Sequence, residues 1–182
     1  MPRHAMTLLV AISLCVGCAG ICEAPDSGDV EGPFVWGAAR NVTRRGNLWF
    51  AGQPDAAGLE AARENGVTVV INMREPGEMR WDEAGAVEDL GMQYFSVPVS
   101  PWRSFPPRSF ERIEEIVEAN SEQQILLHCG TSSRVGGWLA THLVQRDGIS
   151  VDEALAVARR AGLTGRLLKR KVRVYLAESG GR

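Results

Sequence analysis

The sequence has few of the residues that build metal centres or disulfide frameworks. Its 182 residues contain three histidines and four cysteines, and after residue 22 no Cys-x-x-Cys or His-Glu-x-x-His pattern occurs. Three of the cysteines, Cys15, Cys18 and Cys22, lie in the first 22 residues, so Cys129 stands alone in the remaining chain. Such a thiol has no partner for an intramolecular disulfide unless Cys22 is retained. We therefore expect neither a metal nor a cofactor, and a reactive or sheltered Cys129.

The sequence also lacks a strong excess of charge. The formal net charge is −2 at pH 7, which gives no electrostatic reason to expect nucleic acid as a partner. A hydrophobic content of 45% over 182 residues is enough for one ordinary core, and we find no internal repeat. These properties favour a single domain.

No apolar run is long enough to span a bilayer comfortably, but a short one lies near the N-terminus. Arg3 and His4 precede the apolar residues 8–17, which is the order of the charged and hydrophobic regions of a secretory signal. We expect residues 1–22 to be this signal, the polar residues 23–40 to be a flexible linker, and residues 41–178 to be the folded domain.

Two cleavage sites remain open for this segment. Residues 14–18 are similar to a lipoprotein cleavage site in which Cys18 is the lipidated residue, and an ordinary signal-peptidase cut between Ala19 and Ala24 competes with it. Either site predicts an exported protein of the periplasm or cell envelope. A membrane contact is expected only through a lipid anchor at Cys18.

Residues 41–178 alternate between strand-like and helix-like patterns, which is typical of an α/β domain with a mixed or parallel sheet. Residues 67–73 form a nearly continuous apolar run, as expected of a buried central strand. The predicted strands are 47–51, 67–73, 93–99 and 125–128, and the predicted helices are 56–65, 81–90, 107–119, 135–146, 151–160 and 165–178.

Residues 125–136 combine an apolar strand, a cysteine, a loop of small residues and an arginine that opens a helix. The four residues between Cys129 and Arg134 are Gly130, Thr131, Ser132 and Ser133. Their small side chains allow backbone N–H groups to converge on one point, and the positive end of the following helix adds to this anion-binding field. The same field favours the thiolate form of a cysteine, while the planar guanidinium of Arg134 can hold two oxygens. The stretch therefore predicts a nucleophile inside an oxyanion site.

Four intervening residues are one fewer than the five of the familiar cysteine-phosphatase loop. The shorter loop resembles the active loop of rhodanese-type sulfurtransferases. With His128 before the cysteine and Val135-Gly136 after the arginine, it also resembles the phosphatase-like domain of beta-lactamase-hydrolase-like proteins, which is related to tyrosine and dual-specificity phosphatases.

The rest of the chain favours the phosphatase resemblance. Residues 50–54, Phe-Ala-Gly-Gln-Pro, and the strand that ends in Asn72-Met73-Arg74 look like the opening of that domain, an order that rhodaneses lack. Residues 148–155 and 161–164 extend the likeness, so it covers roughly residues 41 to 165. It implies a cysteine-phosphatase-like three-layer α/β domain, with a central, mostly parallel sheet of 4–5 strands flanked by helices.

The resemblance also implies roles for the loop residues. Cys129 would attack phosphorus to give a phosphocysteine, and the backbone from Gly130 through Thr131, Ser132 and Ser133 to Arg134 would bind the substrate oxygens. His128 would orient the loop and support the thiolate, although a purely structural histidine is an equally good interpretation. The expected partner is a phosphorylated protein, such as one carrying phosphotyrosine, or a small phosphate ester.

Two features depart from well-characterised tyrosine phosphatases. Residues 99–107, where those enzymes supply a general acid, contain no carboxylate, which leaves Glu75, Glu78 or Asp82 from another loop as substitutes. A hydroxyl residue commonly follows the arginine, and here Val135 stands there; Ser132 or Ser133 would have to compensate.

Three hypotheses therefore stand. The first is a cysteine-dependent phosphatase-like hydrolase of phosphate monoesters. The second is a sulfurtransferase or persulfide-handling enzyme that carries sulfur on Cys129, which the short loop and the missing acid favour. The third is a catalytically weak oxyanion-binding module at the cell surface, which the presence of a thiol argues against.

Overall fold

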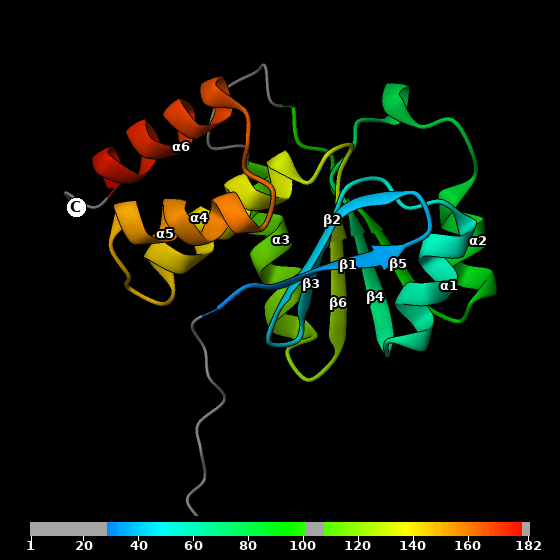
Figure 1. Cartoon of the computed structure of the whole chain (residues 1–182). Helices are drawn as coiled ribbons and strands as arrows, with labels where there is room; N and C mark the ends of the chain where they lie inside the picture. The colour runs from blue at the N-terminus through cyan, green and yellow to red at the C-terminus, as the bar shows by residue number, and fades with distance from the viewer. Residues whose placement is uncertain (1–28, 101–107, 180–182) are drawn as a thin grey trace, which may run out of the picture.

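A six-stranded mixed sheet forms the centre of the protein (Figure 1), in a computed structural model that describes residues 29–100 and 108–179. Along the sheet the strands follow the order β1-β2-β3-β6-β4-β5. Their bounds are β1 Glu31–Trp36, β2 Ala39–Arg45, β3 Leu48–Ala51, β4 Val67–Asn72, β5 Gln93–Ser96 and β6 Gln124–His128. The expected signal, residues 1–22, lies outside the described residues.

The strand that carries the cysteine lies in the middle of this sheet. β6 pairs in parallel with β3 on one side and with β4 on the other, and β4 pairs in parallel with β5. Ala51, Asn72 and His128, the last residues of three neighbouring strands, stand in register. The carboxyl ends of these strands, and the loops that follow them, therefore meet at one edge, where open α/β sheets bind ligands. The loop that begins at Cys129 therefore lies at this edge.

The first two strands correct the expected domain boundary and strand count. Residues 31–40 were expected to belong to a flexible linker, but β1 and β2 pair antiparallel with each other, and β2 pairs antiparallel with β3. Trp36 is buried and its ring lies 4.5 Å from that of Trp49 in β3. Aromatic packing thus holds the hairpin on the sheet edge and makes six strands rather than 4–5.

Helices cover both faces of the sheet and make the domain three-layered (Figure 1). α1 and α2 lie on one face, and α3, α4, α5 and α6 lie on the other. Strand β4 shows why both faces need cover, since Val69 and Ile71 join the core on one side and Val70 joins the core on the other. The helices are α1 Ala56–Glu64, α2 Glu83–Asp89, α3 Arg108–Ala119, α4 Ser133–Gln145, α5 Val151–Arg160 and α6 Arg166–Ser179, with a 3₁₀ turn η1 at Pro76–Glu78.

The predicted elements are all present, with differences at their ends. α2 begins at Glu83 because the side chain of Asp82 accepts a hydrogen bond from the Gly85 N–H and caps the helix there. β5 ends at Ser96, yet the Val97 and Val99 N–H groups still bond to carbonyls of the β4 side. Within the described ranges, no helix is long and apolar enough to cross a membrane.

α4 and the segment that follows α5 approach closely at a glycine. A Cβ added to Gly136 would lie 2.8 Å from the Leu163 backbone nitrogen and 2.9 Å from the Ala158 carbonyl oxygen. Gly137, the next residue of the same buried helix, would place its Cβ no closer than 3.6 Å to any neighbour. Only Gly136 is therefore required by packing.

This pair of glycines gives a matched stability test. We expect Gly136→Ala to destabilise the protein by about 1–3 kcal/mol, because backbone atoms cannot yield as a flexible side chain does. Gly137→Ala should be neutral or stabilising by up to ~1 kcal/mol, since alanine is the better helix former. Urea unfolding of both variants measures this difference, and equal midpoints would refute the packing argument.

Candidate active site

Cys129 lies directly after β6, at the meeting point of three strands. It is 1% exposed, and its N–H donates to the Ala51 carbonyl at the end of β3 over 3.3 Å. On the other side, the Met73 N–H after β4 donates to the His128 carbonyl over 2.9 Å. Both neighbouring strands thus fix the backbone that enters the loop, and the thiol is the free cysteine of the described chain.

The loop residue after Cys129, Gly130, is held by the turn that follows β3. The Gly130 carbonyl accepts a hydrogen bond from the Gln53 N–H over 3.4 Å, within the Gly-Gln-Pro turn noted in the sequence. In a trans peptide the C=O and the next N–H point in opposite directions, so the Thr131 N–H points to the other side. The turn at Gln53 therefore orients part of the predicted backbone cradle.

Ser132 turns the chain into α4 in an unusual way. It has the left-handed backbone conformation, with φ 68°, and its buried side-chain hydroxyl donates to the Ala161 carbonyl over 2.7 Å instead of capping the helix. Gly162 follows Ala161, and a Cβ added to this glycine would lie 2.6 Å from the Ser132 Cβ. Because no side chain caps α4, the N–H groups of its first turn remain available to an anion.

Arg134 is fixed over the loop by contacts that occupy one part of its guanidinium. Nη1 donates to Glu78 Oε2 at 2.7 Å and to the Met73 and Val99 carbonyls at 3.0 Å, and Nη2 donates to Glu78 Oε1 at 2.6 Å. These contacts leave Nε–H and one Nη2–H, which share an edge of the planar group, and the guanidinium also interacts with the Cys129 thiol. This edge has the geometry for two oxygens of one anion.

The charges around Arg134 influence one another. Burial lowers the pKa of Arg134, but the bonds to Glu78 and the charge of Cys129 raise it, and the net shift is upward. The same bonds from Arg134 lower the pKa of Glu78 below its usual value, against the opposing effect of burial. Guanidinium, thiol and carboxylate thus form one electrostatic unit.

An open pocket of about 310 Å³ lies at this loop and is lined by Glu78, Thr131, Ser133, Arg134, Gly165, Leu167 and Leu168. The Ser133 Oγ is buried and has no hydrogen-bond partner among the described residues, whereas Ser132 is already bonded. Of the two hydroxyls considered from the sequence, Ser133 is the one free to act.

His128 contacts a buried carboxylate that sequence reasoning did not identify. Its Nε2 lies 2.6 Å from Glu83 Oε1, and both side chains are fully buried. Glu83 Oε2 also accepts a hydrogen bond from the Gln53 side chain at 2.9 Å, and the Asn72 amide lies 3.5 Å away. A buried carboxylate needs such partners, so the network fixes the His128 ring beneath the loop and supports an orienting role.

The sequence held only partial signals for this network. Gln53 and Asn72 belong to motifs noted in the sequence, but nothing marked Glu83, since an acidic residue in the first turn of a helix is ordinary. Arg74 joins them: its guanidinium donates to the Gln53 side chain and to the Glu78 carbonyl. The motif residues therefore act together as supports of the loop.

The structure bears on the choice among Glu75, Glu78 and Asp82, the three substitute general acids that the sequence left open. Glu78 is committed to Arg134 and its pKa is lowered, so it is a poor proton donor. Asp82 caps α2, and Glu75 is not part of the pocket lining. Residues 101–107, most of the segment 99–107 that lacks a carboxylate, lie outside the described residues. Glu78 is thus an arginine-positioning residue rather than the acid.

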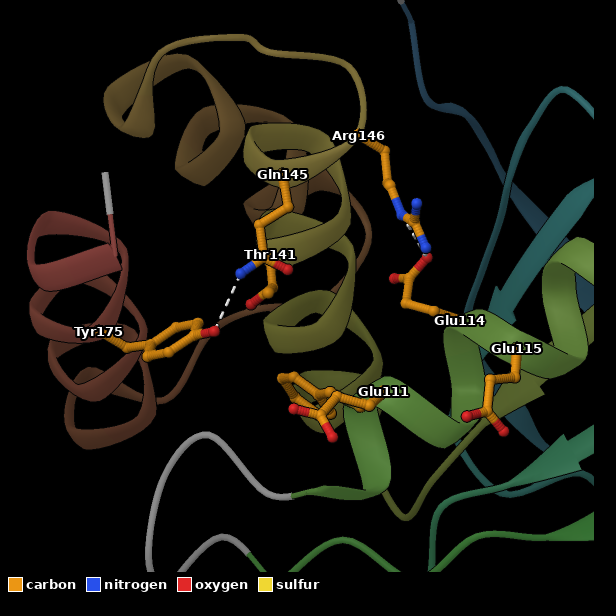
Figure 2. Close-up of a pocket in the computed structure, with 8 residues that line it drawn as sticks. Glu111, Glu114, Glu115, Thr141, Gln145, Arg146 and Tyr175 are labelled. Carbon is orange, nitrogen blue, oxygen red and sulfur yellow. Dashed lines mark hydrogen bonds and ion pairs between the residues drawn. The ribbon is translucent and has the colours of Figure 1, made fainter. Parts of the chain in front are cut away.

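A larger cavity of about 430 Å³ lies between α3, α4 and α6 (Figure 2). Three carboxylates, Glu111, Glu114 and Glu115, line it, and Glu114 contacts His142 Nδ1 at 2.9 Å. Its acidic lining disfavours a phosphate ester, so the oxyanion site is the smaller pocket. The described residues hold no group of three or more His, Cys, Asp or Glu side chains that could bind a metal ion.

The Glu78 carboxylate makes a pH-dependent contribution that can be measured. A carboxyl group whose pKa is lowered by folding stabilises the fold above its ordinary value of 4.5, and this stability is lost as the pH falls through the folded value. Glu78→Gln should therefore be less stable than the parent protein at pH 7, and the difference should shrink at pH 3. Urea titrations at both pH values test this, with Glu75→Gln as the control; a pH-independent difference would contradict it.

No protein-family model matches the sequence, and no curated protein matches it. Solved structures do match. Tk-PTP in its active form aligns with a TM-score of 0.65 and 21% identity, over 79% of this chain and 99% of that chain. TpbA from P. aeruginosa aligns at 0.62 and 18%, over 79% and 89%, and a further TpbA structure contains phosphotyrosine. A DUF442 protein from Shewanella putrefaciens aligns at 0.64 and 19%, over 79% and 90%.

These alignments join proteins of low sequence identity through one arrangement of strands and helices. The chain therefore has the fold of the tyrosine and dual-specificity phosphatases.

Proposed function

We propose that this protein is a cysteine-dependent phosphatase that hydrolyses phosphate monoesters through a phosphocysteine intermediate. The observation that carries the proposal is the Arg134 guanidinium, which Glu78, Met73 and Val99 hold in place while one edge stays open beside Cys129. An uncapped helix N-terminus faces the same loop. Together they supply an anion site with a nucleophile in it.

The first step transfers the phosphoryl group to sulfur. The Cys129 thiolate attacks phosphorus, an S–P bond forms, and the bond between phosphorus and the ester oxygen breaks. Arg134 and the loop N–H groups stabilise the negative charge on the three transferred oxygens. The leaving oxygen takes its proton from water, since Glu78 is held ionised by Arg134.

The second step releases phosphate. Water attacks the phosphorus, the S–P bond breaks, and the thiolate leaves with the electron pair of that bond. A hydrogen bond to the departing sulfur lowers this barrier. Ser133, whose hydroxyl is buried and unpartnered in the described part of the chain, is the group proposed to donate it.

The first test is hydrolysis of an aryl phosphate by the full chain under reducing conditions. Cys129→Ser should abolish turnover, because a serine hydroxyl stays protonated near neutral pH and is a much weaker nucleophile than a thiolate. Arg134→Ala should lower kcat/KM by at least about 10²-fold, as loss of a transition-state donor does elsewhere. Arg159→Ala, an exposed arginine on α5, should leave the activity unchanged.

Two outcomes would contradict the proposal. Turnover that survives in Cys129→Ser would remove the thiol from the mechanism. A protein that lacks phosphatase activity but turns over thiosulfate and carries cyanolysable sulfur on Cys129 would instead be a sulfurtransferase. The four-residue loop between Cys129 and Arg134 also resembles that class of enzyme.

Ser133→Ala tests the second step separately. A hydrogen bond to a charged group is worth about 1.5–3 kcal/mol, so its loss should slow phosphocysteine breakdown about 10–100-fold. Stopped-flow measurement should then show a larger burst of released alcohol before a slower steady state, with the exposed Ser121→Ala as the control. A burst rate that falls as much as the steady-state rate would place Ser133 in the first step or in folding instead.

A further inference from the structure

Helix α6 carries two apolar faces, and only one of them is packed. Leu168, Val172 and Leu176 are buried against α4 and α5, and α6 lies on the outer side of these helices (Figure 1). Leu167 and Val174 stand on the other side and are 52% and 48% exposed. They are seven residues apart, which places them on one helix face about 10 Å from each other.

The same helix concentrates positive charge. It contains five basic residues and one acidic residue, in a chain whose formal net charge is −2. Arg173 is paired with Asp152 at 2.7 Å on the α5 side. Arg170 is exposed, and it stands between Leu167 and Val174 on the unpacked face. The unpacked face is therefore both apolar and basic.

These side chains enclose a hollow next to the pocket at Arg134. A shallow groove of about 350 Å³, the α6 groove, is lined by Leu167, Arg170, Lys171, Val174, Tyr175 and Glu178. Leu167 also lines the pocket at Arg134. The α6 groove is therefore adjacent to the place where the phosphate of a substrate would bind.

We propose that the α6 groove binds the acidic segment next to the phosphorylated residue of a protein substrate. The proposal rests on the proposed phosphatase function and deepens it by naming a substrate class. Arg170 supplies charge to acidic side chains, and Leu167 with Val174 supplies apolar surface to a residue between them. An extended peptide rises about 3.3 Å per residue, so the groove spans about three residues.

A peptide fits this groove better than an anionic membrane does. The hollow accepts side chains, whereas a membrane-bound helix presents a convex apolar face. The shared Leu167 ties the groove to the pocket where the substrate reacts.

The experiment compares three phosphotyrosine peptides with a small aryl phosphate, using the full chain. The peptides carry either three acidic residues before the phosphotyrosine, three after it, or alanines at both places. The parent protein should prefer one acidic peptide, and Arg170→Glu should lower kcat/KM for it about three- to tenfold. Hydrolysis of the small aryl phosphate should not change, nor should either activity in Arg159→Glu, the matched reversal on α5.

Binding separates this proposal from the proposed function. Fluorescence anisotropy with Cys129→Ser should show tighter binding of the acidic phosphopeptide than of the alanine peptide, and Arg170→Glu added to that variant should remove the difference. Peptide binding can be measured even if the protein hydrolyses no ester. The absence of hydrolysis would overturn the phosphatase chemistry but not the binding of acidic peptides to the α6 groove. Equal affinity for all peptides would overturn the α6 groove proposal. A second result would also overturn it. The parent protein would bind phosphatidylserine vesicles and show no preference for acidic peptides, and Arg170→Glu would lose the vesicle binding while Arg159→Glu kept it.

Discussion

The left-handed turn at Ser132 is the constraint on which the site depends. By bonding to the Ala161 carbonyl, the Ser132 hydroxyl leaves α4 without a side-chain cap, and the helix start remains open to a ligand. The turn fits only because Gly162 and Gly136 let the end of α5 approach so closely. Packing between α4 and α5 therefore determines the shape of an anion site that neither helix contains alone.

A second constraint ties the loop after β4 to the same place. Glu78 holds the guanidinium of Arg134, and Arg74 holds the Glu78 carbonyl, so this loop presents the arginine in one orientation. Buried Glu83 does the equivalent for His128. An anion that enters the loop then meets donors that are already oriented, and the proposed phosphatase would need no reorganisation of them during reaction. The cost is a carboxylate that can no longer serve as an acid.

Local patterns in the sequence were sufficient for the elements after residue 46, but not for the β1–β2 hairpin or for the contacts between elements. The apolar run at 67–73 and the strand before Cys129 predicted β4 and β6, because buried strands and a nucleophile loop leave local signals. β1 was missed because Gly32 and Pro33, which lie within it, are typical of a linker, whereas the packing of Phe34 and Trp36 on Trp49 reveals its place. Glu83 contacts His128, 45 residues further along the chain, and Glu78 contacts Arg134, 56 residues further. No local sequence pattern can predict contacts between residues so far apart.

The missing acid narrows the chemistry that this site can perform well. General acid catalysis contributes about 10²–10⁴-fold, and its value grows with the basicity of the leaving oxygen. A tyrosine phenol, with a pKa of about 10, leaves without help far more readily than an alkyl alcohol does. With Glu78 bound to Arg134 and no carboxylate in residues 99–107, an aryl ester is the substrate whose chemistry demands least of this pocket. Selectivity for phosphotyrosine over phosphoserine would then follow from the leaving group itself, while the choice among phosphotyrosine sites would fall to surfaces outside the loop.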